Sequence, residues 1–407
     1  MEDRTPSPGQ QGRVLITPED GSAPFYATVT MADNPTNPGT PLTKETLLQD
    51  STEVEIFGNA GNRTVDEAFS GLMNRIDLIM QNVASMALTI TDTAGNPIPG
   101  VYVNGVFDDD GNAIKTNASG QINGYVAEGD STLSITSYAD ITPYSEVFTA
   151  VKGQSYTKTI QVTTRNFLQI LSSAQYRFSE NVTQVDETVL AAGGGGGRGS
   201  SDSNRCSSGA GGGGGTCVVQ ENVSFTPNIL YPAVVGAAGK GANDTRNTAT
   251  SGGNSSFLGV TATGGNPGGN GTSTGGGSPG SGNGPGGAGV VARSGSYSAN
   301  GNNGSPGTVA GYSSFTETTI YSGGGASGAA AIFNYNASSA TGGSPNGGNG
   351  GGAAGGNAGD GQTAKGFGGG GGGGGSASDN DGYLSTGGGG DGYQGLIAIR
   401  MHLATAA

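Results

Sequence analysis

The sequence predicts a mostly β, multidomain fibrous protein with one short coiled-coil helix. Three observations support this fold class. Of the 83 glycines, 68 lie in residues 193–407, where they form about a third of the segment against about 7% in average proteins. Residues 87–163 alternate apolar and polar side chains between turn signals, which is typical of short strands. Residues 64–86 carry apolar side chains at helical spacing.

These changes of pattern divide the chain into four expected domains, at residues 1–62, 63–86, 87–163 and 164–407. The first is a leader interrupted by prolines, with strand candidates at Arg13–Thr17 and Pro24–Thr30. No apolar region of a secretory signal opens it, and the chain has no run of about 18 apolar residues. We therefore expect neither a signal peptide nor a transmembrane helix.

The helix candidate begins at a capping box formed by Thr64 and Glu67. The apolar side chains that follow are spaced by alternating steps of four and three residues, which is the seam of a coiled coil. The seam comprises Val65, Phe69, Leu72, Ile76, Ile79, Val83 and Met86. No second long helix is predicted to cover this stripe, so self-association as a homotrimer is favoured. The alternative is a single helix that packs on its own domain.

Residues 87–163 predict a small antiparallel, Ig-like β-sandwich. The six strand candidates are Ala87–Thr91, Val101–Val106, Gln121–Val126, Ser131–Thr136, Tyr144–Ala150 and Tyr156–Val162. The stretches Gly95–Val103 and Thr116–Gly120 resemble the carboxypeptidase-regulatory or Cna-B-like modules that serve as spacers in surface proteins. The acidic run Asp108–Gly111 is interpreted as a hairpin turn, because it lacks the spaced ligands and the distant Glu of a calcium loop.

The glycine-rich domain does not keep the period of three that collagen requires, as Gly282–Gly289 shows. A flexible linker is disfavoured, because apolar strand candidates interrupt the glycine runs. We expect polyglycine-II-type helices, packed side by side and hydrogen-bonded to their neighbours, with flanking strands. The apolar stretch Gly395–Arg400 is predicted to be a closing strand.

Residue types argue against catalysis. The chain has one histidine, His402, and two cysteines, Cys206 and Cys217, so no catalytic residue, metal or cofactor is predicted. The two cysteines are interpreted as buried thiols, with a disulfide as the alternative. The net charge of −14 disfavours nucleic acid as a partner. Aromatic residues between the glycine runs are the candidates for receptor contact: Tyr297, Tyr312, Phe315, Tyr321, Phe333 and Tyr335.

Several motifs resemble the glycine-rich tail fibres or minor structural tail proteins of phages and prophages. They are Tyr176–Val182, Val189–Ala192 before a glycine run, Val234–Gly241, Gly252–Phe257, Gly387–Arg400 and the leader stretches Gly12–Gly21 and Gly39–Leu48.

The resemblance implies a trimeric virion protein that is made in the host cytoplasm and assembled into a tail. Residues 1–62 would attach it to other tail or baseplate proteins. The glycine-rich tip domain would face a glycan or protein of the host surface. A purely structural head fibre or baseplate spacer remains open, as does a polysaccharide depolymerase.

Overall fold

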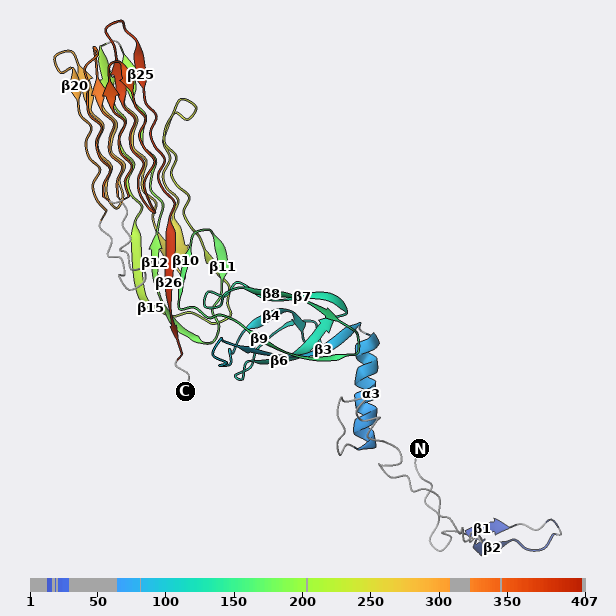
Figure 1. The fold of residues 1–407 in the computed structure, drawn as a ribbon. Coiled ribbons are helices and arrows are strands. Elements are labelled where there is room, and N and C mark those ends of the chain that lie inside the picture. Colours follow the sequence, from blue (N-terminus) through green and yellow to red (C-terminus); the bar gives the residue numbers. More distant parts are fainter. Residues whose placement is uncertain are drawn as a thin grey trace. The chain divides into compact units, whose positions relative to one another are not determined.

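A computed structural model describes residues 13–16, 19, 21–28, 64–80, 82–202, 204–307, 323–344 and 346–404. The chain divides into two units, Met1–Asp77 and Leu78–Ala407, which are treated separately. Most of the described secondary structure is β (Figure 1). Among the helices in the described ranges, none is long and apolar enough to cross a membrane.

The first unit contains an antiparallel hairpin of β1 (Arg13–Ile16) and β2 (Phe25–Thr28), close to the predicted strands. It also contains most of α3 (Val65–Met80). The predicted capping box is confirmed. The N–H group of Glu67 donates to Thr64 Oγ1 at 3.2 Å, and the N–H group of Thr64 donates to the Glu67 carboxylate at 2.5 Å.

The predicted extent of this helix is wrong at its C-terminal end. The helix stops at Met80, and Val83 and Met86 lie in strand β3 (Val83–Thr91), where they are 7% and 2% exposed. Asn82 adopts a positive φ of 54°, a left-handed conformation that commonly ends helices. From that point the alternation of buried and outward residues in β3 replaces the helical period.

The predicted sandwich region forms a sheet of seven strands in the order β8-β7-β4-β6-β3-β9, with β5 paired to β4. Beside β3 these are β4 (Tyr102–Phe107), β5 (Ala113–Lys115), β6 (Gln121–Ala127), β7 (Gly129–Ile135), β8 (Tyr144–Ala150) and β9 (Ser155–Gln161). Met86, Leu88 and Ile90 lie on one face of β3 and belong to the buried core of this region. The prediction of a purely antiparallel arrangement is wrong, because β3 and β9 run parallel.

The glycine-rich domain begins on a four-stranded antiparallel sheet, here called the proximal sheet. Its order is β10 (Phe167–Ile170), β26 (Leu396–Leu403), β12 (Val182–Leu190) and β15 (Cys217–Val223). The predicted closing strand is confirmed, since β26 lies between β10 and β12. Ile397 and Ile399 of β26 join the buried cluster of this sheet.

Smaller strands complete this end. They are β11 (Ala174–Tyr176) with β16 (Tyr231–Ala233), and the hairpin of β17 (Ser255–Phe257) and β18 (Val260–Ala262). Phe178 and Phe257 are 0% and 1% exposed in the same core. This core anchors the glycine runs, which contain few apolar side chains of their own.

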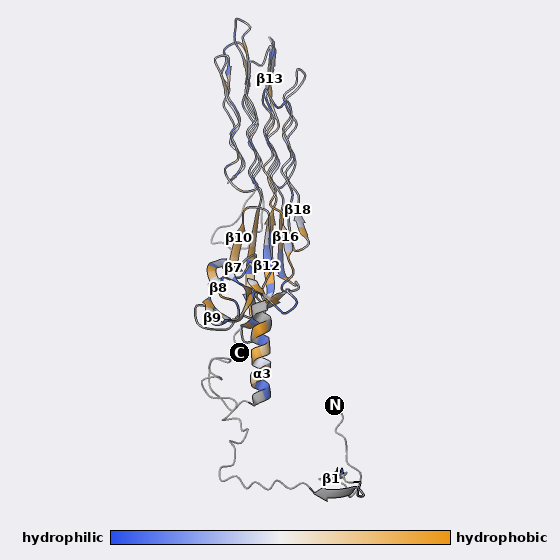
Figure 2. Cartoon of the chain, turned by 90° about the vertical axis from the view of Figure 1, so that its right-hand side faces the viewer, coloured by the Kyte–Doolittle hydropathy of each residue, from blue (hydrophilic) through white to orange (hydrophobic). Residues whose placement is uncertain are grey.

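Extended glycine runs lead from the proximal sheet to a second set of short strands, and they lie side by side in both ribbon views (Figures 1 and 2). Their hydrogen bonds repeat every third residue. The N–H groups of Gly193, Gly196 and Gly199 donate to the carbonyls of Tyr393, Gly390 and Gly387, at 2.9–3.0 Å. The N–H groups of Gly194 and Gly197 point to a different run and donate to the carbonyls of Gly213 and Ala210. A period of three is the repeat of extended threefold helices.

The run Gly193–Gly199 is surrounded by other parts of the same chain. Its carbonyls accept from Gly239, Ala242, Gly371, Gly374, Gly268 and Gly271. The runs around Gly212 and Gly372 are enclosed in the same way. A Cβ atom added at Gly371 would lie 2.0 Å from the carbonyl oxygen of Gly390. Only glycine therefore allows the backbones to approach so closely.

The far end of the runs, here called the distal end, is closed by short strands. These are β13 (Ser200–Asp202), β14 (Arg205–Ser207), β19 (Val291–Arg293), β20 (Ser298–Ala299), β21 (Ala330–Ala331), β22 (Ala353–Ala354), β23 (Asn357–Ala358), β24 (Ser376–Ser378) and β25 (Leu384–Thr386). They form the sheets β13-β14-β19 and β20-β21-β24-β25 and the hairpin β22-β23. Small buried alanines, such as Ala331 and Ala377, fill the space between them.

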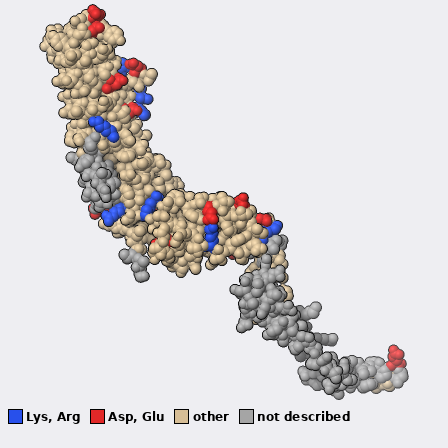
Figure 3. Space-filling model, in the orientation of Figure 1, with Lys and Arg blue, Asp and Glu red and all other residues tan. Residues whose placement is uncertain are grey.

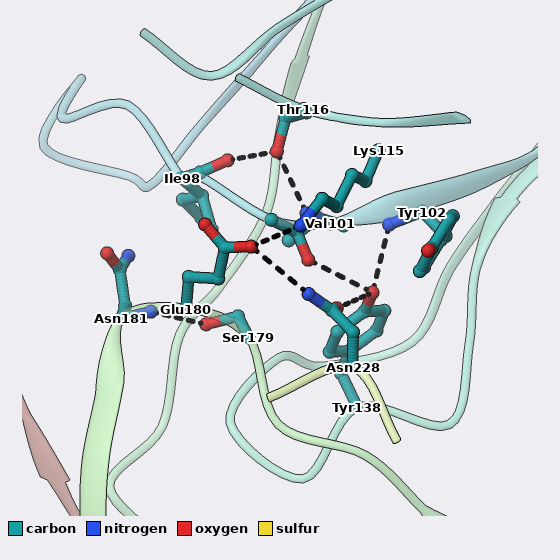
Figure 4. Close-up of polar contacts among 11 residues, drawn as sticks. Ile98, Val101, Tyr102, Lys115, Thr116, Tyr138, Ser179, Glu180, Asn181 and Asn228 are labelled. Carbon is teal, nitrogen blue, oxygen red and sulfur yellow. Dashed lines mark hydrogen bonds and ion pairs between the residues drawn. The ribbon is translucent and has the colours of Figure 1, made fainter. Parts of the chain in front are cut away.

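Polar contacts join the β3–β9 region to the glycine-rich domain within the second unit (Figure 4). Lys115 Nζ lies 2.6 Å from Glu180 Oε1. The Tyr138 hydroxyl accepts from the N–H group of Tyr102 at 2.9 Å and donates to Asn228 Oδ1 at 3.0 Å. Burial raises the pKa of Tyr138 to about 12, so this phenol keeps its proton at physiological pH.

Candidate functional site

Two turns at the distal end bring together three of the six predicted contact residues. Tyr297 lies between β19 and β20, directly after a turn closed by reciprocal backbone hydrogen bonds of Arg293 and Ser296. Phe333 and Tyr335 follow β21. The N–H group of Ile332 donates to the carbonyl of Tyr297 at 2.9 Å and ties the two turns together.

The three rings form an exposed cluster, here called the distal aromatic cluster. Tyr297 and Tyr335 stack with ring centroids 5.0 Å apart and an interplanar angle of 15°. Phe333 meets Tyr297 edge to face at 5.9 Å. Tyr297 and Tyr335 remain 39% and 50% exposed. Aromatic surface that is held rigidly and left open to solvent is suited to contact with a partner.

The backbone beneath the cluster adopts a conformation that side chains normally avoid. Phe333 and Asn334 have φ values of 54° and 60°, and the N–H group of Tyr335 donates back to the carbonyl of Ile332 at 3.2 Å. Left-handed conformations at a bulky aromatic residue are unusual, and such strain concentrates at functional sites. The turn fixes the Phe333 ring against Tyr297.

A further turn lies beside the cluster and carries Tyr383, an aromatic residue between the glycine runs that is not one of the six candidates. The carboxylate of Asp379 accepts from the N–H group of Tyr383 at 2.7 Å, and Tyr383 is 65% exposed. The N–H group of Asn334 donates to the carbonyl of Ser378 at 3.3 Å, which connects this turn to the aromatic one. Acidic side chains are visible at this end in Figure 3, on a domain that otherwise has few charges. The Asp-x-x-Gly-Tyr stretch from 379 to 383 was a possible sequence signal for an exposed turn.

The other predicted residues are not part of this cluster. Tyr312, Phe315 and Tyr321 lie outside the described residues. On α3, Phe69, Leu72 and Ile76 are 63%, 40% and 39% exposed. Met73, which the predicted seam omitted, is 56% exposed beside them. Val65 and Ile79 also lie in the helix. Figure 2 shows apolar residues along α3.

The single histidine and the two cysteines of the chain lie outside the distal aromatic cluster. His402 Nε2 lies 2.9 Å from Asp186 Oδ2 in the proximal sheet. Cys206 and Cys217 are both free thiols. They lie at opposite ends of one extended run, about 30 Å apart at about 3 Å per residue, so the disulfide alternative is excluded. Within the described ranges, no three His, Cys, Asp or Glu side chains gather as metal ligands would.

Comparison with known proteins identifies the family of the glycine-rich domain. Residues 170–402 match a family described as a glycine-rich domain, and this match covers more than half of the chain. The chain therefore belongs to this glycine-rich domain family. A comparison with curated proteins finds no match.

Proposed function

We propose that this chain is a virion structural protein, a tail fibre or tail-tip component that recognises and attaches to a host surface. In this proposal residues 1–62 bind other tail or baseplate proteins, and the distal end of the glycine-rich domain contacts a host glycan or protein. The observation that carries the proposal is the exposed Tyr297–Tyr335 stack, which a strained turn holds at the end of the packed runs.

The architecture of the glycine runs supports a role in presenting the distal end to a host surface. The N–H groups of the run Gly193–Gly199 all donate to acceptors in other segments of the same chain, so these groups need no partner chain to satisfy them. Each copy would then present its own complete distal end. Several copies joined elsewhere would gain avidity from repeated weak contacts.

Attachment is tested with the purified full chain on host cells. We expect saturable binding and competition with particle adsorption. The change Tyr335→Ala should weaken binding at least ~10-fold, because it removes one ring of the stack. The control Tyr393→Ala truncates a tyrosine that is 36% exposed on the run leading to the proximal sheet, and it should bind normally. A chain that neither binds cells nor blocks adsorption would instead support a structural spacer.

The homotrimer is proposed from the exposed apolar side of α3. Phe69, Leu72, Met73 and Ile76 are spaced as one helix face and are all at least 39% exposed. Mass measurement in solution should give a trimer, and Phe69→Asp should dissociate it because a charge would enter the seam. The exposed polar position Asn74→Asp is the control. A monomeric unmodified chain at micromolar concentration would refute this part of the proposal.

A further inference from the structure

A groove with a volume of about 360 Å³ opens on the outer face of strands β9, β3 and β6. Two rows of side chains cross it. Ser85 on β3 is paired with Ser155 on one side and Tyr125 on the other, and Ala87 is paired with Thr157 and Asn123. Met86, between them on β3, points into the core and is 2% exposed, so Ser85 and Ala87 point outward.

The size of the side chains explains the hollow. Ser85, Ala87, Ser155 and Thr157 are small and form a low floor, while Tyr125 and Asn123 stand along the β6 side. The turn that follows β4 adds Asp108 and Asp109 to the wall. The volume lies within the usual range of small-molecule sites, about 300–1,000 Å³.

Hydrogen bonds within the protein hold the wall of the groove in place without a ligand. The Tyr125 hydroxyl donates to the Asp109 carboxylate, and this bond raises the pKa of Tyr125, so the phenol stays protonated. Asp108 Oδ1 accepts from the N–H groups of Asp110 and Asn112 at 3.0 and 2.7 Å, which holds the turn. Groups that are already ordered lose little entropy when they bind.

The chemistry of the lining selects the ligand. Hydroxyl, amide and carboxylate groups can bind the hydroxyls of a sugar, and the Tyr125 ring and the Ala87 methyl group offer apolar surface for its C–H groups. No Lys or Arg is among the lining residues, and Asp108 and Asp109 repel anions. An acidic sugar or a phosphate is therefore disfavoured.

We propose that this groove is a binding site for a neutral sugar unit of a glycan. The inference goes beyond the proposed distal contact, because the groove shares no residue with the distal aromatic cluster. The chain then has a glycan-contacting surface on strands β9, β3 and β6, in addition to the distal end.

The test uses the full chain and a panel of neutral hexose and N-acetylhexosamine oligosaccharides, with matched uronic-acid and sialylated oligosaccharides. Saturable binding of a neutral sugar is expected, with at least tenfold weaker binding of its acidic counterpart. The change Ala87→Leu fills the floor and should lower affinity at least tenfold. Its control is Thr89→Leu, the next outward position of β3, which is not part of the lining.

A second variant keeps the test decisive if Ala87→Leu fails to fold. Asn123 is exposed, so Asn123→Ala should fold normally and weaken the same binding. Tyr335→Ala at the distal end should leave this binding unchanged, which separates the groove from the distal aromatic cluster. The proposal is overturned if no neutral sugar binds at millimolar concentration, if acidic sugars bind equally well, or if Ala87→Leu and Asn123→Ala bind normally.

Discussion

Asp186 and Glu187 are consecutive residues of β12, yet their carboxylates point to opposite faces of the proximal sheet. Burial alone would raise the pKa of Asp186, but the Asn222 N–H group and His402 donate to this carboxylate and lower the pKa below its usual value. Glu187 pairs with Ile399 in the register and shares its face with Val185 and Val189. Neither of its oxygens has a hydrogen-bond partner, and burial raises its pKa to about 8.

This difference predicts how stability depends on pH. Because Glu187 is protonated in the folded chain and ionised in the unfolded chain between its ordinary pKa of 4.5 and about 8, stability falls as pH rises through that window. The limiting slope for one group is about 1.4 kcal/mol per pH unit. The contribution of Asp186 has the opposite sign and is lost as pH falls through its lowered pKa.

The variant Glu187→Gln should remove this slope, since glutamine does not titrate, and should raise the free energy of unfolding at pH 8. Denaturant titrations between pH 5 and 9 measure both effects. The control Glu221→Gln changes an exposed carboxylate on the neighbouring strand β15 and should keep the slope of the unmodified chain. An unchanged slope in Glu187→Gln would show that another group is responsible.

The effect of a glycine-to-alanine substitution on the free energy of unfolding should depend strongly on its position. In Gly371→Ala the new Cβ would meet the Gly390 carbonyl oxygen at 2.0 Å, so several runs must move apart. We expect a loss of ~3 kcal/mol or more. In Gly352→Ala the nearest atom is 3.9 Å away, and the alanine should be neutral or stabilising by up to ~1 kcal/mol. Denaturant unfolding of both variants checks the contrast, and equal effects would contradict the packed arrangement.

The thiols should be slow to react in the folded chain. Burial raises the pKa of Cys217 to about 12 and also raises the pKa of Cys206, which is 0% exposed. Little thiolate is present at pH 7.5, so iodoacetamide should label half-buried Cys217 slowly and Cys206 only after unfolding. Mass spectrometry counts the labels. Rapid native labelling of Cys206, or a disulfide in the untreated chain, would refute the placement of these residues.

The sequence was most informative where side chains set the pattern. The alternation from Ala87 to Thr91 predicted strand β3, and the apolar stretch near the C-terminus predicted β26. The error at Val83 and Met86 arose because their spacing of three residues continues the helical seam, although residues three apart lie on opposite faces of a strand. Their state was decided by the left-handed residue Asn82 and by the core that β3 enters.

The glycine-rich domain shows a different limit. Its runs are nearly identical in composition, so nothing in the sequence pairs Gly194 with Gly213 or Gly371. The stack of Tyr297 on Tyr335 was equally hidden, since it depends on the left-handed turn at Phe333, which carries no glycine signal. Residue types supplied the aromatic candidates, but the pairing of distant segments decided which aromatics meet.

The threefold repeat of the glycine runs restricts how such a domain can change over evolutionary time. Inserting one residue into the run Gly193–Gly199 would rotate every later amide by a third of a turn and aim it at the wrong neighbour. Gains and losses within runs should therefore come in whole turns of three residues. The distal turns are free of this rule. Loops that face outward can therefore lengthen, shorten or change composition while the hydrogen-bonded glycine runs behind them stay the same.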